Sequence, residues 1–263
     1  IEWRQVTGYF PLRPGQAHPK ERKDEVRGTR EITTTLLALA IIIAAVPAQS
    51  ALHLEGQSGV FLNSLAYPLA AGTFEIAGHT VDMGDLGTVY AFSFSTGLGG
   101  SLELGYTRQS SDLDDVLDQD IFSVKYLLAP EAPSYPAFSA IVQSRSLDGG
   151  DSTVDVGLVA TKTTKLGSLP MVIDLGVRST EAIGQGLYGI GDKHKVKWEG
   201  GVAVSVAPQL IVAAEFKQQI AGNTWRDVIV RYAATKNLNI DAGIAHMGPD
   251  LEDQVAIAAT WKF

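Results

Sequence analysis

The sequence predicts an all-β protein: a closed antiparallel transmembrane β-barrel of about twelve strands, preceded by a signal peptide. Three observations predict this fold. A short apolar segment before residue 51 follows a charged stretch. The rest of the chain alternates apolar and polar residues with a period of two, the period of a strand with two different faces. After residue 51 no apolar run is long enough for a membrane helix.

The apolar segment has the pattern of an export signal. Leu36 to Val46 is an uninterrupted run of eleven apolar residues, and the stretch before it, KERKDEVRGTR, carries five basic residues. The small residues Ala48 and Ser50 then stand at the −3 and −1 positions of a cleavage site. As a helix the run would rise only about 16 Å, too little to cross a membrane core. We therefore expect a signal peptide over 32–50, preceded by an unstructured leader or over-extended n-region over 1–31.

Composition excludes several function classes. The formal net charge is −8, which argues against a nucleic-acid partner because such a protein needs a basic face for the phosphates. The chain has no cysteine, so it has no disulfide framework and no thiolate metal site. Charged residues make up 19% and apolar residues 45%, far less apolar than a bundle of membrane helices.

Twelve segments alternate in the manner of strands. In Leu169 to Arg178, for example, every second residue from Leu169 to Val177 is apolar, while Asp174, Gly176 and Arg178 lie on the other face. Most segments have ten to twelve residues, the length that a tilted strand needs to cross a bilayer. The predicted strands are 73–82, 87–96, 99–108, 119–129, 136–146, 152–163, 168–178, 193–206, 209–219, 224–235, 237–247 and 253–263.

The predicted connections alternate between long and short. The third (109–118) and seventh (179–192) are long, whereas the second, eighth and tenth take one or two residues; the fourth, near 130–135, is longer than expected. Such alternation is typical of barrels with both ends on one side of the membrane, and an even number of strands closes without edges. We assign the barrel to 72–263, and residues 51–71 to a segment that is either a plug or a periplasmic lead-in.

The face opposite the apolar one carries charges of both signs. A charge that faces lipid at mid-depth costs about 2–4 kcal/mol, so these side chains are expected to face the lumen. Near balance of the two signs fits either a water-filled pore or an ion-paired plug. The predicted lumen-facing residues are Glu75, Glu103, Lys125, Asp155, Asp174, Arg178, Lys195, Lys197, Glu199, Glu215, Lys217, Asp227, Arg231 and Asp241.

The last strand carries the most specific motif. Val255, Ile257, Ala259, Trp261 and Phe263 alternate with Ala256, Ala258, Thr260 and Lys262 up to a C-terminal Phe. This resembles the C-terminal β-signal of outer-membrane barrels of Gram-negative bacteria, and the stretch Ser58 to Thr73 is similar to the start of several uncharacterised barrel families. The resemblance implies a porin-like protein in the bacterial outer membrane. It also implies that the barrel-assembly machinery recognises Trp261 and Phe263 as an assembly signal.

No catalytic or cofactor site is predicted. Gly184, Gly186 and Gly189 spell GxGxxG, but between two strands and without the helix that a dinucleotide site needs, so no cofactor is expected. The histidines lack zinc-site spacing, and no nucleophile motif indicates a barrel-embedded hydrolase. The loop carboxylates Asp112, Asp114, Asp115 and Asp118 are weak candidates for a Ca²⁺ site, with a solvated acidic loop or ion bridges to lipopolysaccharide as alternatives.

Three functions remain open from the sequence. The first is a narrow channel for small hydrophilic solutes, and the second a plugged structural or partner-binding barrel without transport. The third is a secreted soluble β-sandwich, which the strand lengths disfavour. For either barrel we expect outer-membrane lipid, lipopolysaccharide and the assembly machinery as partners; the oligomeric state stays open.

Overall fold

The computed structural model describes residues 51–263 except 83–86, 113–117, 187–188, 221–223 and 247–252. The predicted leader (1–31) and signal peptide (32–50) therefore lie outside the described residues. Among the described residues, no helix has both the length and the apolar character needed to cross a membrane.

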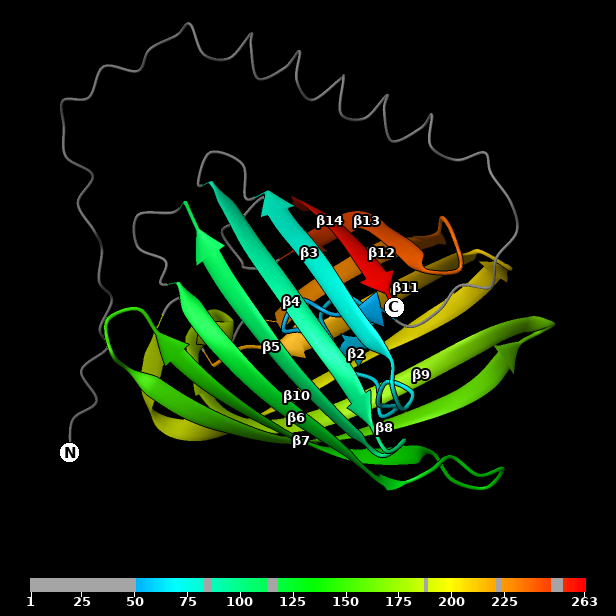
Figure 1. The fold of residues 1–263 in the computed structure, drawn as a ribbon, viewed down its shortest axis with the longest axis horizontal. Helices are drawn as coiled ribbons and strands as arrows, with labels where there is room; N and C mark the ends of the chain where they lie inside the picture. The colour runs from blue at the N-terminus through cyan, green and yellow to red at the C-terminus, as the bar shows by residue number, and fades with distance from the viewer. Residues whose placement is uncertain (1–50, 83–86, 113–117, 187–188, 221–223, 247–252) are drawn as a thin grey trace, which may run out of the picture. The chain divides into compact units, whose positions relative to one another are not determined.

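Twelve antiparallel strands close into one barrel, as Figure 1 shows. Each strand pairs with its neighbours in sequence, and β14 pairs with β3 to complete the ring. The fold class predicted from the period-two pattern is confirmed. The strands are β3 (Phe74–Asp82), β4 (Thr88–Leu98), β5 (Leu102–Ser111), β6 (Gln119–Ala129), β7 (Ala137–Leu147), β8 (Ser152–Leu166), β9 (Leu169–Ala182), β10 (Ile190–Ala207), β11 (Leu210–Gln218), β12 (Thr224–Ala233), β13 (Leu238–His246) and β14 (Gln254–Lys262).

The first and last strands meet at one end of the barrel, which we call the closing end. There the N–H of Phe263 donates to the carbonyl of Phe74 at 2.8 Å. Four of the five connections at this end have two to four residues, and the exception is 130–136. The connections at the opposite end have four to seven residues, and one of them contains the short 3-10 helix η3 (Ile183–Gly186). The long and short connections thus alternate as expected.

The hairpin of β9 and β10 differs most from the predicted spans. Residues 179–192 were expected to form a loop, yet β9 continues to Ala182 and β10 begins at Ile190. Lys195 pairs with Thr180 in register, so the polar end of this hairpin is still sheet. Residues 179–192 have the polar composition of a loop, which is why the sequence predicts one. Where a strand extends past the bilayer, however, its backbone can pair without an apolar face.

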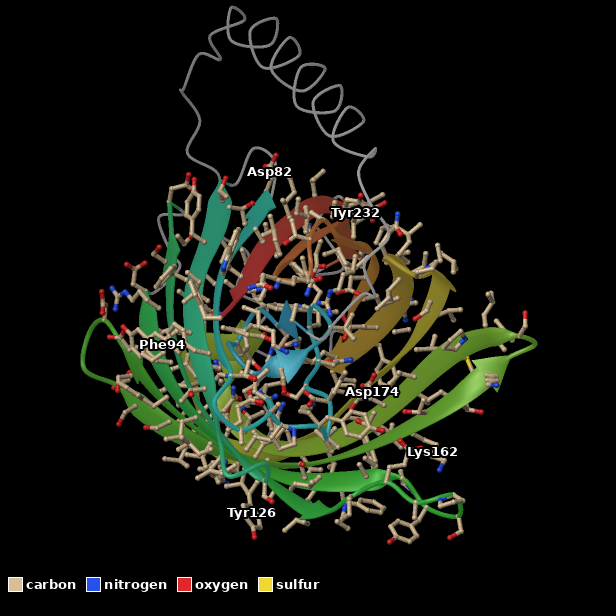
Figure 2. The ribbon with its side chains drawn as sticks, turned by 45° about the vertical axis from the view of Figure 1, so that its right-hand side comes forward. Asp82, Phe94, Tyr126, Lys162, Asp174 and Tyr232 are labelled. Atoms are coloured by element: carbon tan, nitrogen blue, oxygen red, sulfur yellow. The ribbon has the colours of Figure 1, made fainter. Side chains whose placement is uncertain are left out.

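The outer face of the wall is apolar and the inner face is polar. Every second residue of β4 points outward, among them Phe92 (56% exposed) and Phe94. Their neighbours Ser93 and Ser95 point inward and are buried. Figure 2 shows Phe94 and Tyr126 on the outside of the ring. In water such a surface would be a large exposed apolar patch, whereas lipid tails match it.

The chain from Ala51 to Gly72, which we call the inner segment, lies inside this ring (Figures 1 and 2). It contains the two-residue strands β1 (Ala51–Leu52) and β2 (Ser58–Gly59), which pair with each other. Every residue from Ala51 to Ala66 is buried. The segment leaves the lumen at the closing end, where the N–H of Gly72 donates to the carbonyl of Gly97 at 3.0 Å.

Candidate functional site

The candidate functional site is the charged lumen together with the inner segment that occupies it. Most of the predicted lumen-facing residues are buried on the inner face of the wall. These are Glu75, Glu103, Lys125, Asp155, Asp174, Arg178, Glu199, Glu215, Lys217, Asp227, Arg231 and Asp241. Lys197 is only partly buried and Lys195 is exposed, because both lie on the part of β10 that rises above the rest of the wall.

Glu55 of the inner segment is surrounded by three cations of the wall. Lys217 Nζ lies 2.7 Å and Arg178 Nη1 lies 2.8 Å from Glu55 Oε2, and Arg145 Nη2 bonds to Oε1. The Glu55 side chain is entirely buried. Because β7, β9 and β11 each supply one cation, a single carboxylate of the inner segment ties together three strands that are far apart in sequence.

Glu215 of β11 holds the tip of the inner segment. Its carboxylate accepts hydrogen bonds from the backbone N–H groups of Phe61, Leu62 and Asn63, at 2.8, 3.0 and 3.1 Å. The Asn63 side chain adds a bond to the carbonyl of Gly200 at 2.8 Å. Buried N–H groups in a turn need acceptors, and here the barrel wall provides the acceptor that secondary structure does not.

Glu103 and Lys125 perform the same task on the other side of the lumen. Glu103 accepts from the N–H groups of Ser58 (2.7 Å) and Leu69 (2.8 Å). Lys125 Nζ donates to the carbonyl of Ser58 at 2.7 Å. Arg231, which is paired with Asp241 at 2.8 Å, donates to the carbonyl oxygens of residues 59 and 60. Wall charges therefore bind the backbone of the inner segment more than its side chains.

Small wall residues let the inner segment approach closely. A Cβ added at Gly56 would lie 2.0 Å from Thr107 Oγ1, and Gly56 has a φ of +81°, which favours glycine. A Cβ at Gly105 would lie 2.5 Å from the hydroxyls of Ser95 and Ser123 and 2.9 Å from the carbonyl of Gly56. The contact between the turn at Gly56 and β4–β6 thus depends on the absence of side-chain volume on both sides.

Several buried carboxylates have no protein donor. Both side-chain oxygens of Asp227 and of Glu75 accept no hydrogen bond from the described part of the chain, and neither does Asp174 Oδ2. Asp227 lies directly opposite Glu215 in the register of β11 and β12. A carboxylate buried without a donor is costly, and water is the usual remedy. These oxygens mark the places on the inner face where no described residue supplies a donor.

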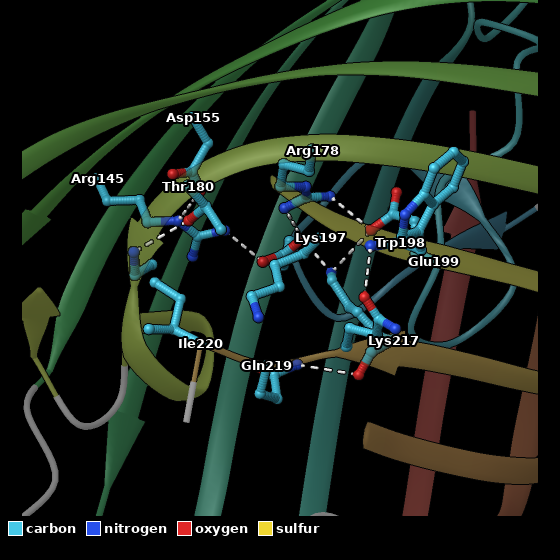
Figure 3. Close-up of a pocket in the computed structure, with 13 residues that line it drawn as sticks. Arg145, Asp155, Arg178, Thr180, Lys197, Trp198, Glu199, Lys217, Gln219 and Ile220 are labelled. Atoms are coloured by element: carbon cyan, nitrogen blue, oxygen red, sulfur yellow. Dashed lines mark hydrogen bonds and ion pairs between the residues drawn. The ribbon is translucent and has the colours of Figure 1, made fainter. Parts of the chain in front are cut away.

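A small recess with a volume of about 20 Å³, open to solvent, lies above the Glu55 cluster at the opposite end of the barrel. Figure 3 shows the side chains that line it. Four cations and three carboxylates are among them: Arg145, Arg178, Lys197, Lys217, Glu55, Asp155 and Glu199. Lys197 makes no hydrogen bond or ion pair with the described residues, and Arg178 Nη2 has only the ion pair to Glu199 at 3.3 Å.

At the closing end, Tyr67 of the inner segment bonds to Glu131 in the connection between β6 and β7. Glu131 also pairs with Lys162 at 3.0 Å. The hydrogen bond from Tyr67 and the contact with Lys162 lower the pKa of the Glu131 carboxyl to about 2. The ionised form of Glu131 is thus the one that holds the exit of the inner segment.

The weak calcium candidates do not assemble into a metal site in the described residues. Asp112 bonds to the N–H of Thr88, and Asp118 pairs with Arg108 at 3.1 Å. Asp114 and Asp115 lie outside the described residues. Among those described, no group of three or more His, Asp or Glu side chains could hold a metal ion.

A serine and a histidine do meet, within the inner segment rather than on the wall. His53 Nε2 lies 2.8 Å from Ser64 Oγ, while His53 Nδ1 accepts from the N–H of Glu55. Nε2 must therefore carry the proton and donate, and Ser64 donates in turn to Gln57. A histidine base for a nucleophilic serine needs the reverse arrangement. The pair braces the inner segment.

Two residues central to the site, Glu55 and Arg145, are missing from the set predicted from sequence. Glu55 lies in a stretch without periodicity, so no pattern assigns it a partner. Arg145 lies in a predicted strand and shares its face with Gln143, so the alternation along this strand could have predicted that Arg145 faces the lumen. The predicted assembly signal, Trp261 and Phe263, is exposed on the outer face.

A closed twelve-stranded wall with an apolar outer face and a polar inner face defines the protein as an outer-membrane β-barrel. Within this class, the chain belongs to the family described as "Protein of unknown function (DUF3034)", whose model matches residues 49–257.

Solved structures agree with the fold at low sequence identity. The "KdgM porin" superposes with a TM-score of 0.54 at 9% identity, covering 73% of this chain and 99% of that one. The "KdgM porin in complex with disordered oligogalacturonate" gives 0.53 at 10%, covering 73% and 99%. A "NanC porin structure" gives 0.52 at 11%, covering 72% and 100%. A search of curated proteins finds no match.

Proposed function

We propose that the protein is a gated channel of the bacterial outer membrane for small hydrophilic solutes, closed at rest by its inner segment. The observation that carries the proposal is the seating of the inner segment: wall charges at three levels of the lumen bind it through Glu55, through the turn at 61–63 and through Ser58. Each of these contacts replaces water that the wall would bind in an empty lumen.

The polar inner face of the wall favours a channel rather than a barrel that is permanently plugged. Replacing buried ion pairs by well-packed apolar residues is often neutral or stabilising, so a lumen that never opens has no need of them. The inner face also includes the acidic side chains of Asp227 and Glu75, which lack donors among the described residues. The polar inner face of this wall can be hydrated when the inner segment leaves, whereas an apolar inner face would collapse or bind lipid.

The likeness to porins is a likeness of fold. One of those structures is a porin in complex with oligogalacturonate, and that ligand belongs to that porin. For this chain we propose diffusion of small polar solutes and outer-membrane residence, with lipid, lipopolysaccharide and the assembly machinery as partners. We propose no enzymatic role.

A plugged structural barrel is the second candidate, and one observation favours it. The tip of the inner segment buries Phe61 and Leu62 completely, in a cluster with Val81, Trp225 and Ile229 of the wall. An apolar anchor of this size stabilises by several kcal/mol, roughly 1.5–3 for each buried side chain, and would make opening rare.

A reversible cross-link separates the two candidates. The chain has no cysteine, and the N–H of Ala66 donates to Thr161 Oγ1 at 2.7 Å, so Ala66→Cys with Thr161→Cys places one disulfide between segment and wall. In planar bilayers the reduced protein should show openings that vanish on oxidation. The single variant Ala66→Cys is the control and should conduct under both conditions. If the reduced protein and a variant lacking residues 52–70 both stay silent, the barrel is structural.

A further inference from the structure

The recess above Glu55 is built from more cations than its own wall can neutralise. Without the inner segment, Arg145, Arg178, Lys197 and Lys217 face only two wall carboxylates, Asp155 and Glu199. Arg145 is held by Asp155 at 2.8 Å, while Arg178 and Lys217 share Glu199 at 3.3 and 3.7 Å. The wall therefore lacks a carboxylate here, and Glu55 supplies it.

We propose that this recess binds a solute bearing a carboxylate, and that the incoming carboxylate replaces Glu55 between Arg178 and Lys217. Glu55 is then an internal stand-in for the solute. The replacement of Glu55 rests on the gated channel proposed above, whereas binding in the recess does not require it.

The geometry orders the steps of binding. Lys197 is partly exposed at the entrance, and its ammonium is unpaired among the described residues, so it meets an anion first. Below it, Arg178 Nη2 retains an N–H without an acceptor. The solute carboxylate gains a charge-assisted hydrogen bond there before any contact of Glu55 is broken. Exchange at Lys217 follows, since its bond to Glu55 is a single ammonium–oxygen contact of 2.7 Å.

Release of Glu55 loosens the inner segment at one point only. Its other contacts, at Glu215 and Glu103, lie deeper in the lumen. At the level of Glu215 the wall carries Asp174 and Asp227 as well, so three acidic side chains lie together below the recess. The cations that would select the solute thus lie at the entrance, and the acidic side chains lie deeper in the lumen.

Titration calorimetry on the full-length protein in detergent tests the proposal by measuring the affinity for glucuronate. Glucose, which lacks the carboxylate, is the control ligand. We expect saturable binding of glucuronate and none of glucose. Lys197→Gln should weaken glucuronate binding about tenfold, as the loss of one charge-assisted contact implies. Lys165→Gln, which removes an exposed lysine near the turn at the closing end, should leave the affinity unchanged.

A second experiment changes Glu55, the carboxylate that competes with the solute. Glu55→Gln removes the internal competitor, so glucuronate should bind this variant at least tenfold more tightly than the parent. Equal affinity would overturn the exchange with Glu55, and absence of glucuronate binding to the parent would overturn the site. Should Glu55→Gln fail to fold, the comparison of Lys197→Gln with Lys165→Gln in the parent decides alone. Glucuronate binding without conductance in the reduced Ala66→Cys/Thr161→Cys protein would contradict the gated channel and leave the site standing.

Discussion

At the scale of single residues, the lumen is organised by where side chains are missing as much as by where charges lie. Gly105 on β5 and Gly56 on the inner segment face each other, and the carbonyl of Gly56 accepts a bond from Ser95. A side chain at either position would occupy the space of the other backbone. A glycine inside a strand often marks a site where another backbone approaches closely, and Gly105 is such a site, although the sequence does not say which segment approaches it.

Gly105→Val tests this contact without altering the inner segment. The added atoms would collide with the Gly56 carbonyl, and overpacking of this kind costs about 1–3 kcal/mol. We expect the segment to unseat, so that protease cleaves within 51–72 several times faster and channel openings become more frequent. Gly78→Val, on the outer face of β3 where an added Cβ meets nothing within 4 Å, should leave both rates unchanged. Equal cleavage of the two variants would show that Gly105 does not control the seating.

At the scale of elements, the terminal strand closes the ring. Phe263 extends β14 by two backbone hydrogen bonds with Phe74, and their rings lie 5.9 Å apart. The row of outward aromatic rings continues through Phe94, Tyr106 and Phe122, with centroids 5.0–6.1 Å apart. The terminal Phe therefore packs across the seam between β14 and β3, in addition to its proposed role in recognition by the assembly machinery.

Phe263→Ala should lower the amount of folded barrel in the outer membrane and raise degradation in the periplasm. The variant loses the aromatic contact at the seam and the residue that the β-signal resemblance singles out. Heat-modifiable gel mobility of membrane fractions measures the folded amount. Phe263→Tyr keeps the ring and should restore most of it. Undiminished folded protein in Phe263→Ala would contradict an assembly role for this residue.

At the scale of the whole molecule, two sequence features predict export and membrane insertion: the apolar segment before residue 51 and the apolar outer face of the strands. The apolar segment before residue 51 predicts cleavage, and the apolar belt on the wall requires a membrane. We expect the mature protein to begin at Ala51 or within two residues of it and to fractionate with the outer membrane. Intact mass of the extracted protein measures the first point. Retention of Leu36 to Val46 in that mass would contradict export by this route.

The strands, their order and their two faces follow from sequence alone, because alternation is a local property. In the strand at Leu169 to Arg178, the apolar face and the charged face are adjacent in the chain and need no partner to be recognised. The predicted lumen charges belong to the same local pattern. Strand ends were less predictable, as the β9–β10 hairpin shows, because backbone pairing there continues past the apolar pattern.

Only the tertiary structure decided what fills the lumen. Residues 51–72 have no period, and their bonds join positions such as Glu55 and Lys217, which are 162 residues apart. The partners are backbone N–H and carbonyl groups as often as side chains, and every residue carries those, so composition cannot single them out. Alternation determined that the wall is charged inside. Ring closure, which brings β7, β9 and β11 around one point, determined that those charges meet at Glu55.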